Sequence, residues 1–224
     1  MSNIIEVVVL VEGQTEQKFI KDILAPYLYS KQIYLKPIIF SKPGQKGGDV
    51  RFDRVIGDIG LHLKQRSDTY LTLLFDYYGI KGDWPGLLES KKKANHHLKA
   101  QTFIESLRES VLAKFKELRP ELRFIPYIAM HEFEALLFSS TEVLAEHLHV
   151  NVNLVESILS ECGEPENIND SPETAPSKRL DKLSSKFKKM TTGISIAKEI
   201  GIDEIRKACP LFNKWVKSLE ALIA

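Results

Sequence analysis

Four short apolar segments, separated by stretches with helical periodicity, constrain the fold of this 224-residue chain more than any other feature. They occupy residues 4–11, 33–40, 70–75 and 124–130. The first is β-branched and almost continuously apolar, which is typical of a strand buried on both faces. Pro37 interrupts the second and favours a position near the edge of a sheet. The alternation of strands and helices predicts an α/β fold with a mostly parallel sheet flanked by helices.

Apolar residues at helical spacing predict the helices between these strands. The expected buried positions are Phe19, Ile20, Ile23, Leu24, Tyr27 and Leu28, then Val55, Ile59 and Leu63, then Ile104, Leu107, Val111 and Leu118. Loops are expected at 41–48 and 76–86, and a helix at 131–138 directly after the fourth strand. Beyond about residue 139 the pattern predicts short helices around an acidic loop at 161–173. We therefore expect a core at 1–138 and a helical C-terminal extension at 139–224, packed on that core.

Composition bears on three classes of protein: nucleic-acid-binding proteins, disulfide-rich or cysteine zinc proteins, and membrane or secreted proteins. The chain has 31 Lys and Arg against 30 Asp and Glu, so nucleic-acid binding would depend on local patches of charge. Cys162 and Cys209 are far apart, which argues against a disulfide framework or a cysteine zinc site and suits a reducing compartment. The early apolar run is too short to span a membrane and lacks the features of a signal peptide. These observations predict a cytoplasmic protein.

Acidic residues follow three of the four predicted strands. Glu12 comes after the first, Asp76 after the third, and Glu132 after the fourth, preceded by His131. The carboxyl ends of parallel strands share one edge of a sheet, where open α/β proteins place their sites, so these carboxylates should lie close together. Oxygen ligands of this kind suit Mg²⁺. The alternative for each residue alone is a helix cap or a turn.

Three neighbouring residues are further candidates. Glu16 lies one helical turn beyond Glu12 and either faces it or interacts with the helix N-terminus. Glu134 is ranked lower because on a helix it points away from Glu132. His131 either contacts phosphate or acts as an acid, or is a hydrogen-bonded structural residue.

Several segments, taken in order, resemble a known family. VVVLVEGQTEQKFI (7–20), LLFDYYG (73–79), HEFEALLF (131–138), INDSPETAPSKRL (168–180) and GISIAKEIG (193–201) are similar to a bacterial Toprim-like family of unknown function. That family is distantly similar to the nuclease domains of OLD-type proteins and to the topoisomerase–primase domain. The resemblance implies a Toprim fold in which a strand-end Glu and a D-x-D pair hold Mg²⁺ for phosphodiester chemistry.

Glu12 matches the strand-end Glu of that pattern, and Asp76 matches the first Asp of the pair. Tyr78 stands where the second Asp is expected, so Asp83 or Glu132 would have to substitute, or the site is a reduced one. We therefore assign Glu12, Asp76 and Asp83 to the metal, Mg²⁺ or Mn²⁺. Glu12, Asp76 and Glu132 are the candidate catalytic residues.

The leading functional hypothesis is a metal-dependent nuclease or related phosphodiester-processing enzyme acting on nucleic acid. The alternative is a non-catalytic Toprim-like subunit that binds a partner ATPase, because OLD-type proteins combine both activities and this chain has no G-x-x-x-x-G-K-[ST] motif. A small-molecule phosphohydrolase is a third and weaker alternative. Homo-oligomerisation remains open.

Two basic segments are candidate phosphate contacts. Pro176 and Ser177 predict a helix start, which places Lys178 and Arg179 at a helix N-terminus, where an anion would offset their unfavourable interaction with the helix dipole. The alternative is a solvated basic face paired with the acidic loop. The second segment, KKKANHHLK (91–99), contains His96 and His97. As adjacent residues they are not expected to share a ligand face on a helix, and the segment is either solvated surface or steers phosphate.

Overall fold

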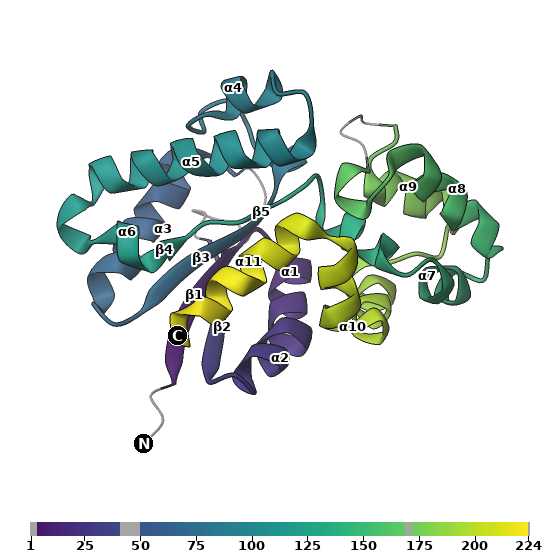
Figure 1. Ribbon diagram of the computed structural model, residues 1–224, viewed down its shortest axis with the longest axis horizontal. Helices are drawn as coiled ribbons and strands as arrows, with labels where there is room; N and C mark the ends of the chain where they lie inside the picture. Colours follow the sequence, from purple (N-terminus) through teal and green to yellow (C-terminus); the bar gives the residue numbers. More distant parts are fainter. Residues whose placement is uncertain (1–3, 41–49, 169–170, 172, 224) are drawn as a thin grey trace.

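The centre of the molecule is a parallel sheet of five strands flanked by helices, as the alternating pattern predicts (Figure 1). This computed structural model describes residues 4–40, 50–168, 171 and 173–223. The strands are β1 (Ile5–Val11), β2 (Ile33–Ile39), β3 (Tyr70–Asp76), β4 (Phe124–Ile125) and β5 (Ile128–Ala129). Their order is β2-β1-β3-β4, and β5 also pairs with β3. The strand with Pro37 is therefore at an edge, which confirms the prediction.

The fourth apolar segment is not one continuous strand, as expected, but two strands of two residues each. Pro126 separates them, and a proline has no N–H to donate to a neighbouring strand. The helix predicted at 131–138 is also different, because the structure has a 3₁₀ helix, η4 (Phe133–Ser139), with Glu132 as its N-cap. Side chains three residues apart eclipse on such a helix, so its faces differ from those of an α-helix.

Helices form most of the remaining chain. The α-helices are α1 (Gln14–Phe19), α2 (Ala25–Tyr29), α3 (Phe52–Gln65), α4 (Leu87–Lys91), α5 (His96–Lys114), α6 (Pro120–Arg123), α7 (Thr141–Leu148), α8 (Val152–Cys162), α9 (Pro176–Leu183), α10 (Ile194–Ala208) and α11 (Pro210–Glu220). Shorter 3₁₀ and π-helices are η1 (Ile20–Leu24), η2 (Tyr77–Gly79), η3 (Lys116–Leu118), η5 (Pro165–Asn167), η6 (Lys189–Gly193) and η7 (Ala221–Ile223). The described residues after 139 contain helices and no strand, as predicted. None of the described helices combines the length and apolar character that crossing a membrane requires.

The two faces of the sheet are covered by different helices. On β1, Val7, Val9 and Val11 belong to a core shared with α1, α2, α10 and α11, whereas Val8 and Leu10 pack with α3 and α5. This follows from the alternation of side chains along a strand. The predicted loop at 41–48 lies outside the described residues, as do 169–170 and 172 of the predicted acidic loop.

The C-terminal helices return to the sheet, where α11 lies along the strands (Figure 1). Trp215 on α11 donates from Nε1 to Thr72 Oγ1 of β3 at 2.8 Å. Its ring stacks on Tyr127, between β4 and β5, with centroids 4.5 Å apart. The C-terminal segment thus shares a core with the sheet, and the proposed boundary at residue 138 stays a prediction.

A buried carboxylate fixes the start of α11. Glu166 is 1% exposed and accepts hydrogen bonds from the backbone N–H groups of Leu211 and Phe212, at 2.7 and 2.9 Å. These groups belong to the first turn of the helix, which has no internal partner for them. Burial raises the pKa of Glu166 to about 7, although both backbone hydrogen bonds act in the opposite direction.

Candidate active site

Glu12 and Asp76 lie at the carboxyl ends of neighbouring strands, as the pattern predicts. Glu12 directly follows β1, and Asp76 is the last residue of β3, which pairs with β1 in parallel. The loop after β3 comes back over Glu12: a Cβ on Gly79 would lie 3.5 Å from Glu12 Oε2. Asp76 Oδ1 accepts a hydrogen bond from the backbone N–H of Phe133 at 2.9 Å, which ties β3 to η4.

Glu16 joins this pair from the first turn of α1. Its side chain is 8% exposed, and its Oε2 lies 3.2 Å from the position that a Cβ on Gly13 would occupy. Burial raises the pKa of Glu16, and the negative charge of Glu12 raises it further. Backbone hydrogen bonds at Glu16 and Gly13, at the helix N-terminus, lower the pKa of Glu16, so the structure supports both interpretations that the sequence leaves open.

Glu134, on η4, is the most deeply buried member of the group, with 1% of its surface exposed. Lys189, the first residue of η6, reaches it, and the two charged atoms, Nζ and Oε1, are 2.5 Å apart. Burial raises the pKa of Glu134, and Lys189 opposes the rise. For Lys189, burial lowers the pKa, but the carboxylates of Glu134 and Asp76 outweigh burial and raise it.

We call Glu12, Glu16, Asp76 and Glu134 the acid cluster. The pKa of Asp76 is well above its ordinary range because of burial first, and then because of the charges on Glu16, Glu134 and Glu12. Four ionised carboxylates and one ammonium, that of Lys189, would leave a net charge of −3 (−4 + 1). Among the described residues, Glu12 Oε2 and Glu134 Oε2 are buried without a hydrogen-bond partner. The cluster therefore has oxygen atoms that can accept a cation, and its fully ionised form has excess negative charge.

Two predicted site residues have structural partners. Glu132 accepts hydrogen bonds from the backbone N–H and the hydroxyl of Ser177, at 2.8 and 3.1 Å, and so caps α9. It still contributes charge, since it raises the pKa values of Glu12 and Glu134. Asp83 is exposed and accepts from the backbone N–H of Phe52 at 2.7 Å, at the start of α3. Glu134, which is buried beside Lys189, is therefore the stronger site candidate, whereas the sequence placed Glu132 above it.

The predicted phosphate-binding pair is at the start of α9, as expected, but Arg179 is held by other groups. It donates to the carbonyl of Thr174 at 3.1 Å and pairs with Glu161 at 3.2 Å. Lys178 is exposed, and its closest ion pair, with Asp181, is long at 3.9 Å. The pairing of Arg179 with Glu161 matches the second interpretation, in which this basic face pairs with the acidic segment 161–173. Within the described part of the chain, Lys189 is the cation that pairs with the acid cluster.

The aromatic residues near the cluster mostly stabilise the loop after β3. Trp84 is 3% exposed and donates from Nε1 to the carbonyl of Val50 at 2.9 Å. His131 is 3% exposed, its ring lies 5.9 Å from that of Tyr77, and its carbonyl accepts from the Tyr78 N–H at 3.0 Å. This supports a structural role for His131. Tyr78, at the place of the second Asp in the D-x-D pattern, is 42% exposed.

Sequence reasoning missed Lys189 and undervalued Glu134. Lys189 belongs to a run of basic residues, KFKK, and no pattern in the sequence separates it from its neighbours. Glu134 did carry a signal: it is the one charged residue within the apolar stretch 133–138, where a buried carboxylate needs a partner.

Comparison with known proteins supports a family assignment without a function. A family model described as Domain of unknown function (DUF4276) matches residues 11–220. Searches of curated proteins and of solved structures find no significant match. The family match runs from the last residue of β1 to the last residue of α11, and this chain therefore belongs to the DUF4276 family.

Proposed function

We propose that this chain is a Mg²⁺- or Mn²⁺-dependent nuclease or related phosphodiester-processing enzyme, with the acid cluster as its active site. The observation that carries the proposal is the convergence of Glu12, Glu16, Asp76 and Glu134 from three separate segments at one sheet edge. Burial, and then the charges of Glu16, Glu134 and Glu12, raise the pKa of Asp76. Keeping carboxylates together in this way has a free-energy cost, which is typical of functional sites.

The chemistry of the donors fits a hard divalent cation. All donors are carboxylate oxygens, which Mg²⁺ and Mn²⁺ accept, and two of the oxygens lack a hydrogen-bond partner among the described residues. Glu12 and Asp76 would hold the ion. When bound, such an ion lowers the pKa of a water ligand and neutralises charge on a phosphodiester.

The protein's own groups would share the remaining tasks. Glu16 and Glu134 have raised pKa values, so either can hold or accept a proton closer to neutral pH than an exposed glutamate can. Lys189 is 46% exposed beside Glu134 and can interact with a phosphate oxygen. Gly79 lies against the carboxylate of Glu12, with the position of a Cβ 3.5 Å from Oε2. The resemblance to Toprim-like proteins at Glu12 and Asp76 supports nucleic acid as the substrate.

The second candidate function is a non-catalytic subunit that binds a partner ATPase. The ion pair between Lys189 and Glu134 favours it, because an internal ammonium already offsets part of the negative charge that a metal ion would neutralise. The two candidates differ in whether the acid cluster performs chemistry.

A cleavage assay separates them. The purified chain would be incubated with plasmid DNA, single-stranded DNA and RNA, with Mg²⁺, with Mn²⁺ or with EDTA. We expect metal-dependent cleavage that falls by at least about 100-fold in Glu12→Gln and Asp76→Asn. Asp68→Asn is the matched control, because Asp68 is exposed just before the amino end of the same strand, β3. Equal cleavage by Asp76→Asn and Asp68→Asn would contradict the proposed site, and a wild-type chain that cleaves none of these substrates would favour the second candidate.

A further inference from the structure

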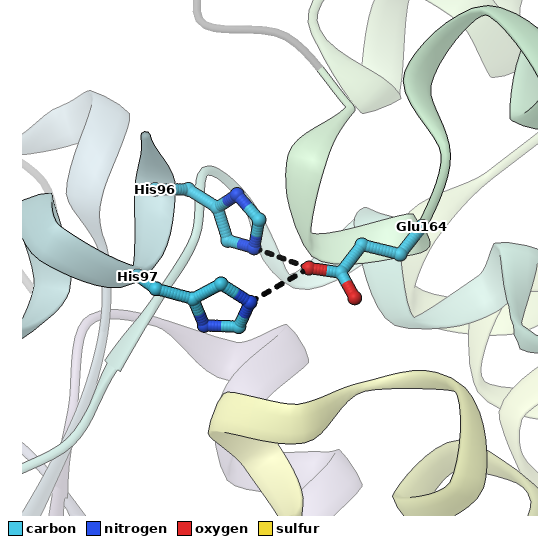
Figure 2. Close-up of side chains that lie close together, drawn as sticks. All are labelled: His96, His97 and Glu164. Atoms are coloured by element: carbon cyan, nitrogen blue, oxygen red, sulfur yellow. Dashed lines mark ion pairs between the residues drawn. The ribbon is translucent and has the colours of Figure 1, made fainter. Parts of the chain in front are cut away.

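Two adjacent histidines and a distant glutamate converge on one point (Figure 2). His96 Nε2 lies 2.5 Å and His97 Nε2 lies 3.0 Å from the same oxygen, Glu164 Oε1. The histidines open α5, whereas Glu164 stands between α8 and η5. The possible ligand atoms all lie within 4.8 Å of one another. This grouping joins the helix that covers one face of the sheet to the C-terminal segment.

The prediction that His96 and His97 would not share a ligand face is therefore wrong. Consecutive residues on a helix point about 100° apart. These two occupy the first turn, directly after the N-cap Asn95, where no preceding turn restricts the side-chain rotamers. Their rings can turn toward each other, with centroids 4.1 Å apart.

Hydrogen bonds around His96 identify which ring nitrogen carries a proton. Asn167 Nδ2 donates to the carbonyl of Cys162 at 2.6 Å, and since a carbonyl only accepts, the orientation of the Asn167 amide is fixed. Asn167 Oδ1 therefore faces His96 Nδ1, at 3.1 Å, and Nδ1 is the donor. In neutral His96 the lone pair is then on Nε2, which points at Glu164.

An acceptor thus faces an acceptor. His96 is 6% exposed, and within the described part of the chain its Nε2 is buried without a hydrogen-bond partner, although it lies beside the Glu164 carboxylate. A proton on Nε2 or a metal ion between these atoms resolves the conflict, and His97 Nε2, 3.0 Å from the same oxygen, offers a metal ion a third ligand. Histidine ligands of metal ions commonly donate their other ring N–H to an oxygen, as His96 does to Asn167.

We propose that His96, His97 and Glu164 bind one divalent transition-metal ion, with Zn²⁺ as the best-fitting class. Two imidazole nitrogens and a carboxylate oxygen suit Zn²⁺ or Co²⁺ better than Mg²⁺. Ligand atoms at about 2.0–2.1 Å from a tetrahedral Zn²⁺ are about 3.3 Å apart, and here they lie within 4.8 Å of one another, so small adjustments of the three side chains would accommodate the ion. Three protein ligands leave a fourth position for water. The ion would connect α5 to the segment after α8, and this site is separate in its ligands from the acid cluster.

Titration calorimetry with ZnCl₂ on the tag-free full chain tests the proposal, and the visible spectrum of the Co²⁺ form reports the ligand geometry. We expect one Zn²⁺ per chain and a Tm that rises with Zn²⁺, because the ion binds the native state. His97→Ala and Glu164→Gln should each weaken binding by at least about tenfold, and so should Asn167→Ala, as a positioning residue. His97 is 46% exposed, so its replacement should leave the fold intact.

His147→Ala is the matched control, because His147 Nε2 contacts Glu199 at 2.7 Å in a pair without a second histidine. It should bind Zn²⁺ like the wild type, and so should Asp76→Asn in the acid cluster. The proposal is overturned if the wild type does not bind Zn²⁺, or if His97→Ala and Glu164→Gln bind it as tightly as the wild type. Neither outcome depends on whether the chain cleaves nucleic acid.

Discussion

Replacing Lys189 with methionine should lower the free energy of unfolding, because the repulsion among the carboxylates of the acid cluster is then no longer offset by an ammonium group. The substitution keeps most of the side-chain length and removes the ammonium group 2.5 Å from Glu134 Oε1. Removing one partner of a fully buried pair costs about 3–5 kcal/mol, whereas exposed pairs contribute about 0–1 kcal/mol. Glu134 is 1% exposed but Lys189 is 46% exposed, so water screens the lysine. We expect an intermediate loss of about 1–2 kcal/mol in the free energy of unfolding at about pH 8.

The loss should depend on pH in a defined direction. Without Lys189, the folded-state pKa of Glu134 rises further above its ordinary value of 4.5. A carboxyl whose pKa is raised by folding destabilises the native state above its unfolded pKa, and this effect disappears as pH falls below that value. The difference between variant and wild type should therefore shrink from about pH 8 toward about pH 4.5.

Urea unfolding followed by circular dichroism measures this difference at each pH. Lys188→Met is the matched control, since Lys188 is the exposed neighbour in the same basic run. Adding Glu134→Gln to Lys189→Met should recover much of the lost stability, because the unpaired charge is then absent. A loss that is independent of pH, or equal to that of Lys188→Met, would refute the reasoning.

Three further substitutions test individual contacts. Burial raises the pKa of Glu166 to about 7, so this residue should lower wild-type stability as pH rises from 4.5 through about 7. Urea unfolding between about pH 4 and pH 8 should therefore show a loss of stability that is larger in the wild type than in Glu166→Gln by about 3 kcal/mol. Gly86→Ala should lose about 1–3 kcal/mol, because φ is +73° and the new Cβ would lie 2.4 Å from Ser106, whereas Gly82→Ala, with open space, should lose less. Glu132→Ala removes the acceptor at the start of α9 and should lower stability by about 1 kcal/mol, and a Tm equal to that of the wild type would exclude this capping role.

The sequence pattern predicts the sheet and indicates Glu12, Glu16 and Asp76 of the acid cluster. Apolar runs followed by a carboxylate are a local signal, and parallel strands convert it into proximity, so Glu12 and Asp76 were predictable. The position of Pro37 also predicted the edge strand β2 correctly. These inferences succeed because each depends on one strand and on the general geometry of parallel sheets.

The ion pair of Lys189 with Glu134 and the grouping of His96 with Glu164 depend on contacts between distant segments. Lys189 reaches Glu134 across 55 residues (189 − 134), and its local sequence resembles any exposed basic run. An α-helix at 131–138 would point Glu134 away from Glu132, whereas the 3₁₀ helix that forms there has different faces. The pairing of His96 with Glu164 requires the C-terminal segment to pack beside α5, and no local periodicity reports that packing.

A Mn²⁺ titration followed by electron paramagnetic resonance of the free ion tests the central claim most directly. The titration would use the His97→Ala chain, so that the separate histidine site does not contribute. We predict one Mn²⁺ bound per chain, and binding weakened by at least about tenfold when Glu12→Gln and Asp76→Asn are added, with Asp68→Asn as the unaffected control. Mn²⁺ binding that is equal with and without these two carboxylates would contradict the assignment of the acid cluster as a divalent-cation site.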